Sequence, residues 1–124
     1  MIYVFRHGRT FEDGEQSYDL APNDDPPLTE FGLEQAKIAG HYCDSFGYPV
    51  VCGPQQRHRK FAKQIKSEII FDEKLNEGGE LFIRPNSIMV TSNGVLKKFH
   101  GHVNCGNLCI LDNNGEIHAW NIKP

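Results

Sequence analysis

The sequence predicts an α/β protein whose mainly parallel sheet is flanked by helices and carries an antiparallel hairpin at one edge. Two observations lead to this fold class. Short apolar runs alternate along the chain with segments in which apolar residues recur every three or four positions. The turn signal Asp112-Asn113-Asn114-Gly115 separates the last two apolar runs, as expected for a hairpin. The length of 124 residues suits a single domain spanning residues 1–124.

The first strand is expected at residues 2–5, and a long polar loop follows at residues 11–27. A helix should begin after Thr29, whose hydroxyl is a suitable N-cap, and end near residue 46, before Gly47 and Pro49. Its buried stripe contains small residues that allow close packing on a sheet, namely Gly32, Ala36, Ala39, Cys43 and Phe46.

The rest of the chain repeats this alternation. Residues 49–52 form a short strand, and Gly53-Pro54 opens a second helix with proline at its first helical position. The apolar side of that helix contains Ala62, Ile65 and Ile69. The remaining expected elements are strands at 69–71, 87–92, 108–111 and 117–120, and a short helix from 94 to about 99.

The composition excludes several classes of protein. With 39% hydrophobic and 23% charged residues the chain is ordinary globular material, and its formal charge of -3 gives no overall attraction to nucleic acid or an anionic membrane. It contains no apolar stretch long enough to span a bilayer, and its beginning does not resemble a signal peptide. We therefore expect a cytoplasmic protein with neither a nucleic-acid nor a membrane partner.

The four cysteines form no CxxC pair, which favours reduced, packed thiols over a disulfide framework. A zinc set can be drawn from His100, His102, Cys105 and Cys109. The two cysteines of that set would share one strand face, however, and suit the core equally well. We therefore expect no metal site.

Polar segments follow three of the predicted strands. They are Arg6-His7-Gly8, Gly53-Pro54 with Arg57 one turn into the next helix, and Ser92-Asn93-Gly94. If the strands are parallel, these segments meet at one edge of the sheet, where α/β proteins bind ligands. Helix N-termini and two arginines would then surround one concavity, which suits a doubly charged phosphoryl group.

The residue types at this edge point to phosphoryl chemistry. A neutral His7 beside Arg6 is suited to attack phosphorus, and Gly8 lets a substrate approach the backbone closely. Taken alone, the tripeptide is better explained as a chance strand end. Arg57, taken alone, is a solvated residue of the first helical turn. The convergence of three strand ends favours the site.

In order and spacing the sequence resembles the histidine phosphatases, the phosphoglycerate mutase-like superfamily. The matching positions cover most of the chain, at residues 2–10, 27–32, 35–36, 53–54, 57, 62, 75–77, 90–94 and 120–121. The resemblance implies a phosphoglycerate mutase-like fold and a phosphohistidine mechanism that uses no metal or other cofactor.

The resemblance also implies roles for individual residues. His7 attacks the phosphorus, and the phosphoryl oxygens are held in a pocket formed by Arg6, Arg57, Gly8, Thr10 and Asn93. An acidic residue protonates the leaving oxygen and then activates water. Glu77 matches the position of that acid, and Glu80 is its rival.

The sequence departs from the family pattern in two places. Members usually carry a second histidine after the fourth strand, where this chain has Asn93, an amide that donates a hydrogen bond but brings no positive charge. His100 and His102 are not expected to replace it, because no apolar strand precedes them. Only residues 78–86 separate Glu77 from the fourth strand, so the helical insertion that roofs mutase-like members is missing. The segment is also too short for the usual crossover helix, so we expect either that this helix is absent or that the strand order is altered.

Two functions follow from these features. The first is a metal-independent phosphatase, a phosphoric monoester hydrolase weakened by Asn93, which acts on a phosphomonoester or a phosphoprotein. An unroofed site admits water and large substrates, which favours hydrolysis over phosphate transfer. The second is an impaired member that binds phosphate or a phosphorylated partner without turnover.

Overall fold

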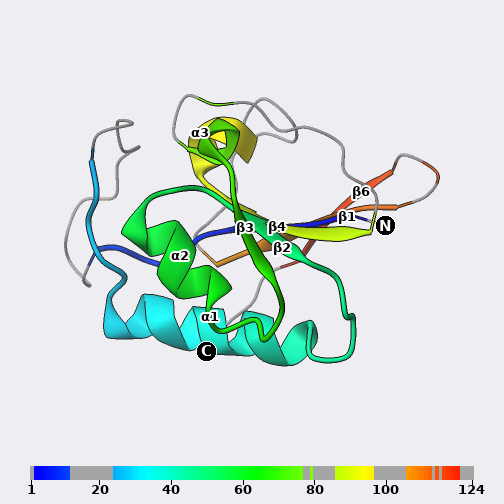
Figure 1. Ribbon diagram of the computed structural model, residues 1–124, viewed down its shortest axis with the longest axis horizontal. Helices are drawn as coiled ribbons and strands as arrows, with labels where there is room; N and C mark the ends of the chain where they lie inside the picture. The colour runs from blue at the N-terminus through cyan, green and yellow to red at the C-terminus, as the bar shows by residue number, and fades with distance from the viewer. Residues whose placement is uncertain are drawn as a thin grey trace.

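A central six-stranded sheet organises the computed structural model, which describes residues 2–11, 24–76, 79, 86–96, 106–112, 114 and 116–120. Helices α1 and α2 cover one face of the sheet, and the short helix α3 lies on the other (Figure 1). The strand order is β3-β2-β4-β1-β5-β6. The expected α/β class, with a mainly parallel sheet and an antiparallel edge, is confirmed.

The parallel part of the sheet is built from four strands, which are β1 (Ile2–Arg6), β2 (Val50–Cys52), β3 (Ile69–Phe71) and β4 (Ser87–Thr91). Strand β4 pairs in parallel with β1 on one side and β2 on the other, and β2 pairs with β3. The antiparallel part consists of β5 (Leu108–Leu111) and β6 (Ile117–Trp120). All five residues of β4 are buried, as expected for a central parallel strand.

Helix α1 (Glu30–Tyr42) begins where the sequence predicts, since the hydroxyl of Thr29 accepts a hydrogen bond from the backbone N–H of Gly32 at 3.1 Å. The helix is shorter than expected. Residues 43–46 form a turn that leads into Gly47, at φ +68°. Phe46 still packs against the core, so its spacing reflects packing of the turn rather than a longer helix.

Helix α2 (Gln56–Ala62) begins later than the sequence predicts. Pro54 lies outside the helix, and Gln55 is the N-cap. The reason is that the N–H of Gly53 still donates to the carbonyl of Val90 at 3.0 Å. Gly53 therefore remains paired with β4, and the helix can begin only after the chain has left the sheet. Helix α3 (Asn93–Leu96) starts one residue earlier than expected, and residues 97–99 of that expectation lie outside the described part of the chain.

Each face of the sheet has its own apolar core. The face under α1 and α2 packs residues such as Phe5, Ala39 and Phe61, and the opposite face packs Val4 and Met89 with residues from two short elements. Those short elements are the 3-10 turn η1 (Glu73–Leu75), which contributes Leu75, and α3, which contributes Leu96. Within its described residues, the connection from β3 to β4 contains this one 3-10 turn in place of a crossover helix.

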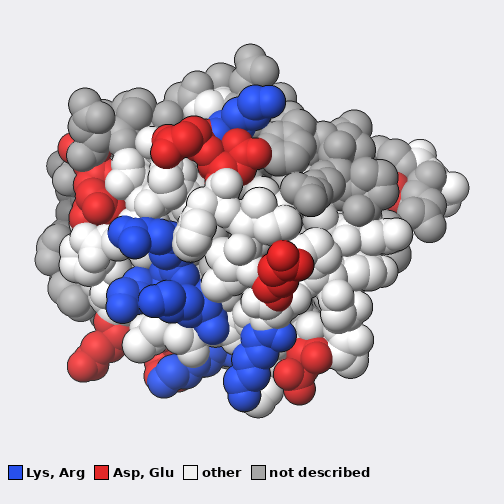
Figure 2. All heavy atoms as spheres, in the orientation of Figure 1, with Lys and Arg blue, Asp and Glu red and all other residues white. Residues whose placement is uncertain are grey.

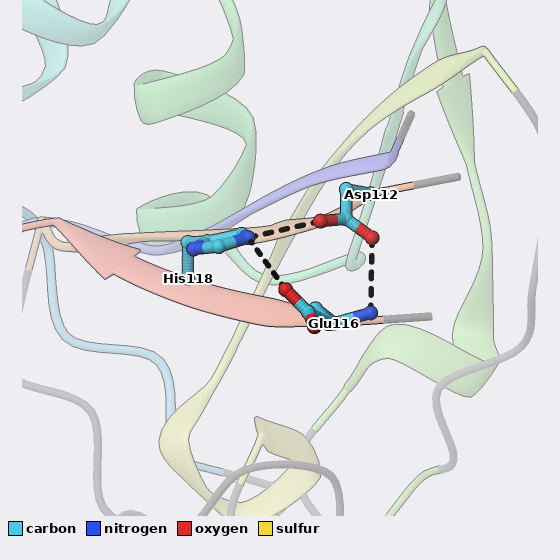
Figure 3. Close-up of side chains that lie close together, drawn as sticks. All are labelled: Asp112, Glu116 and His118. Carbon is cyan, nitrogen blue, oxygen red and sulfur yellow. Dashed lines mark hydrogen bonds and ion pairs between the residues drawn. The ribbon is translucent and has the colours of Figure 1, made fainter. Parts of the chain in front are cut away.

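The hairpin of β5 and β6 is held at its turn by side chains. Asp112 accepts hydrogen bonds from the backbone N–H groups of Asn114 and Glu116, and its second carboxylate oxygen lies 2.9 Å from His118 Nε2 (Figure 3). These bonds hold the pKa of Asp112 below its usual value. Because Ile2 pairs with Leu111, this cluster lies at the end of the sheet opposite to the end of β1.

Three cysteines, Cys43, Cys52 and Cys109, are buried and form no disulfide. Burial raises the pKa of the Cys43 and Cys52 thiols to about 12, so they behave as small apolar residues. Among the residues that the structure describes, no helix is long and apolar enough to cross a membrane.

Candidate active site

The three polar segments predicted to converge do meet at one edge of the sheet. His7 follows β1, and its N–H donates to the carbonyl of Thr91 at 3.0 Å, which places it beside Ser92 at the end of β4. Gly53 follows β2 on the other side of β4. The parallel pairing that this convergence required is therefore present.

His7 is 2% exposed, and hydrogen bonding fixes its ring. Its Nδ1 lies 2.8 Å from the carbonyl oxygen of Gly8. A carbonyl only accepts, so Nδ1 carries the proton and Nε2 keeps a lone pair. The pKa of His7 is held well below its usual value, first by burial and then by the neighbouring His58 and Arg6. The ring is therefore neutral at pH 7, which is the state needed to attack phosphorus.

Two buried arginines accompany His7. Arg6 precedes it in β1 and is 7% exposed, and Arg57 in the first turn of α2 is fully buried. Burying two guanidinium groups in one place is unfavourable unless they meet an anion or strong acceptors. Arg57 Nη1 donates at 2.8 Å to the backbone carbonyl of Asp24, a contact that the sequence did not predict.

The segment that begins at Asp24 lies across the start of α2. Asp25 Oδ1 accepts from the backbone N–H of Gln56 at 2.8 Å, and the side-chain amide of Gln56 donates to the backbone carbonyl of Asp25 at 2.5 Å. Oxygen atoms of Asp24 and Asp25 thus accept hydrogen bonds from Arg57 and from the backbone at the start of α2, which the sequence predicted to bind a phosphoryl group. A ligand that uses Arg57 must displace or share these contacts.

A second histidine, His58, lies in the same place and was missed by the sequence analysis. It is fully buried, and its ring centroid is 5.5 Å from that of His7, with 58° between the ring planes. Its Nε2 lies 2.6 Å from Ser92 Oγ. Burial, and then Arg57, lower the pKa of His58 to about 3, so this ring is also neutral.

A signal for His58 was present in the sequence. Helix α2 buries Phe61 and Ala62, and His58 precedes them on the same face at the spacing of three and four. Because His58 is next to Arg57 in the sequence, its burial places it at the same end of α2 as the predicted site.

Gly8 also has a packing role that the sequence did not predict. A Cβ atom at Gly8 would collide with the backbone of Gly32 in α1, and one at Gly32 would collide with the backbone of Arg9. The loop after His7 therefore packs directly on the first turn of α1. Two further bonds anchor it, because the N–H of Arg9 donates to Gln35 Oε1 at 2.9 Å and its carbonyl accepts from the N–H of Thr29 at 3.0 Å.

The other predicted site residues are described only in part. Thr10 is half-buried in the loop after His7. Asn93 begins α3, next to Ser92, but its side chain lies outside the description. Glu77 and Glu80, as well as His100, His102 and Cys105 of the zinc alternative, lie outside the described residues.

The surface over α2 and α1 is locally basic although the chain carries a formal charge of -3. No acidic residue occurs between positions 53 and 67. Lys and Arg side chains gather over α2 and α1 (Figure 2), where the exposed basic residues are Lys37, Arg59, Lys60, Lys63 and Lys66. Such a surface attracts anionic molecules toward this side of the protein.

The protein thus has an α/β fold with a buried histidine and two buried arginines near the carboxyl edge of its parallel strands. The chain belongs to the histidine phosphatase superfamily, branch 1, whose family model matches residues 2–81. The resemblance inferred from the sequence is thereby confirmed. No curated protein sequence gives a significant match.

Solved structures share the fold at low sequence identity. SixA from Agrobacterium tumefaciens, assigned as a phosphohistidine phosphatase, superposes with a TM-score of 0.65 at 13% identity over 97% of this chain and 94% of its own. Phosphoserine phosphatase from Entamoeba histolytica, solved with 3-phosphoglyceric acid, gives 0.69 at 12% identity over 99% and 96%. Alpha-ribazole phosphatase from Shigella flexneri gives 0.68 at 15% identity over 99% and 96%.

Proposed function

We propose that the protein is a metal-independent phosphatase that works through a phosphohistidine formed on His7. The observation that carries this proposal is the state of the His7 ring. Its Nδ1 proton is held by the Gly8 carbonyl, its Nε2 lone pair is available, and buried Arg6 and Arg57 accompany it. Membership of the histidine phosphatase superfamily supports the same chemistry.

The reaction has two steps in this proposal. In the first, the Nε2 lone pair of His7 forms a bond to phosphorus while the bond from phosphorus to the leaving oxygen breaks and an acid protonates that oxygen. In the second, water attacks phosphorus, the P–N bond breaks, and the same carboxylate accepts the proton from water. Arg6 and Arg57 stabilise the charge on the phosphoryl oxygens in both steps. Glu77, or its rival Glu80, takes the acid role.

We propose a phosphomonoester or a phosphoprotein as substrate. The short connection at residues 78–86 leaves no room for a helical roof, and a structural neighbour is assigned as a phosphohistidine phosphatase. The basic surface of α2 and α1 favours an anionic substrate of either kind.

A second candidate function rests on Asn93. Without a positive charge at that position, the protein binds phosphate or a phosphorylated partner but turns it over slowly or not at all. Loss of one transition-state donor typically costs about 10² to 10³ in rate.

One experiment separates the two functions. Hydrolysis of p-nitrophenyl phosphate is measured in EDTA for the wild type and for His7→Ala, with circular dichroism to confirm that both fold. Activity that His7→Ala abolishes supports the phosphatase. Vanadate binding without any hydrolysis supports the binding function, and hydrolysis that survives in His7→Ala contradicts the proposed nucleophile.

A further inference from the structure

We infer that His58 is a positioning residue of the phosphoryl site, which holds Ser92 through a hydrogen bond and packs against the ring of His7. This inference rests on the proposed function and adds a residue that the family resemblance does not supply. The two side chains it acts on lie at the ends of neighbouring strands, since His7 follows β1 and Ser92 follows β4.

The geometry places His58 between the strand ends and α2. Its ring lies 5.5 Å from the His7 ring, and its Nε2 is 2.6 Å from Ser92 Oγ. On the other side, its Nδ1 lies against Gly53, where a Cβ atom would collide with the ring. His58 therefore contacts residues that follow all three converging strands, β1, β2 and β4.

The surroundings of the ring decide where its single proton lies. Nδ1 is buried and has no hydrogen-bond partner. The hydrogen of Gly53 that stands in the Cβ position points toward Nδ1, so a bare lone pair fits there better than a second N–H. The proton therefore belongs on Nε2, which donates it to Ser92 Oγ. The Ser92 hydroxyl then keeps its own proton for another acceptor.

Fixing Ser92 also fixes the residues that follow it. The carbonyl of Ser92 accepts the N–H groups of Val95 and Leu96, each at 3.1 Å, so Ser92 anchors the turn that carries Asn93. His58 thus supports the position at which the family usually has its second histidine. It does so as a neutral ring that donates one hydrogen bond, and it adds no positive charge beside His7.

The test compares four variants with the wild type, using p-nitrophenyl phosphate hydrolysis for activity and calorimetric titration with vanadate for binding. The variants are His58→Ala, His58→Gln, Ser92→Ala and the double variant His58→Ala/Ser92→Ala. His41→Ala, which replaces an exposed histidine in the last turn of α1, is the matched control. We expect His58→Ala and Ser92→Ala each to lower kcat by as much as about 10², the loss expected from small misplacement of reacting groups. The double variant should be no worse than either single one.

Two readouts distinguish positioning from a general loss of structure. His58→Gln, whose amide can donate to Ser92, should recover much of kcat. His58→Ala should move the acid limb of kcat/KM to higher pH, because loss of the packed ring exposes His7 to water and relieves the burial that lowers its pKa.

Unchanged kcat and pH profile in folded His58→Ala would overturn the inference, as would additive effects in the double variant. If His58→Ala does not fold, an unchanged kcat in Ser92→Ala overturns it instead. A wild type that neither hydrolyses the ester nor binds vanadate refutes the proposed function itself and, with it, the role of His58.

Discussion

Replacement of Arg57 by alanine should weaken oxyanion binding by about two orders of magnitude. A fully buried guanidinium can give an oxyanion two charge-assisted hydrogen bonds, each contributing about 1.5 to 3 kcal/mol. To bind the oxyanion, Arg57 must give up its hydrogen bond to the carbonyl of Asp24, which reduces the gain in binding free energy by about 1 kcal/mol. The remaining 2 to 5 kcal/mol, at about 1.4 kcal/mol per factor of ten, corresponds to at least about 30-fold in Kd.

The assay is calorimetric titration with vanadate at pH 7 and constant ionic strength. Lys74→Ala is the matched control, because Lys74 is exposed, carries the same charge and lies on η1, outside the basic surface of α2 and α1. We expect its Kd to stay within about twofold of the wild type, since exposed charges contribute little. Equal affinities for wild type and Arg57→Ala, with both proteins folded, would remove Arg57 from the site and refute the reasoning.

The other predictions concern the intermediate, Asn93 and pH. Quenched enzyme should contain phosphate bound to His7 that is labile to acid and stable to base, and turnover should persist in EDTA; a strict need for added divalent metal would contradict the mechanism. Asn93→His should raise kcat by up to about 10² to 10³, and a folded, vanadate-binding variant that is no faster would place the defect elsewhere. Because the pKa of His7 is lowered, kcat/KM should stay level as pH falls through 6.5 and decline only below it; an acid limb at 6.5 would contradict a buried neutral ring. Because the folded state lowers the pKa values of His7 and His58, the unfolded chain binds more protons than the folded protein below about pH 6.5. The free energy of unfolding, measured by urea titration, should therefore fall as the pH drops below about 6.5. No change between pH 7 and 5 would contradict this.

Much of the sheet could be predicted because its signals are local. The apolar runs, the cap at Thr29 and the turn at Asp112 each depend on neighbouring residues. The errors occurred where tertiary contacts override local preference. Pro54 has the right chemistry for a first helical position, but pairing of Gly53 with Val90 delays the helix. Phe46 fits the helical spacing, but it packs from a turn.

The candidate site shows the same division. His7, Arg6 and Arg57 could be proposed from the sequence because each lies at the end of a recognisable strand or at the start of a helix. The bond from Arg57 to Asp24 joins residues 33 positions apart, and the bond from His58 to Ser92 joins residues 34 apart, so no local pattern reveals either. His58 nevertheless lies on the buried face of α2. It was not predicted to be buried because histidine is not counted among the apolar residues that define such a face.

The contact between Gly8 and Gly32 limits how this chain can be stabilised. Glycine inside a helix is unfavourable by about 1 kcal/mol relative to alanine, so α1 considered alone would gain from Gly32→Ala. In the folded protein that methyl group would meet the backbone of Arg9 and press on the loop that holds His7. A substitution that favours α1 on its own would therefore displace the loop that places His7. Helix stability and the position of the histidine thus make opposite demands on this one residue.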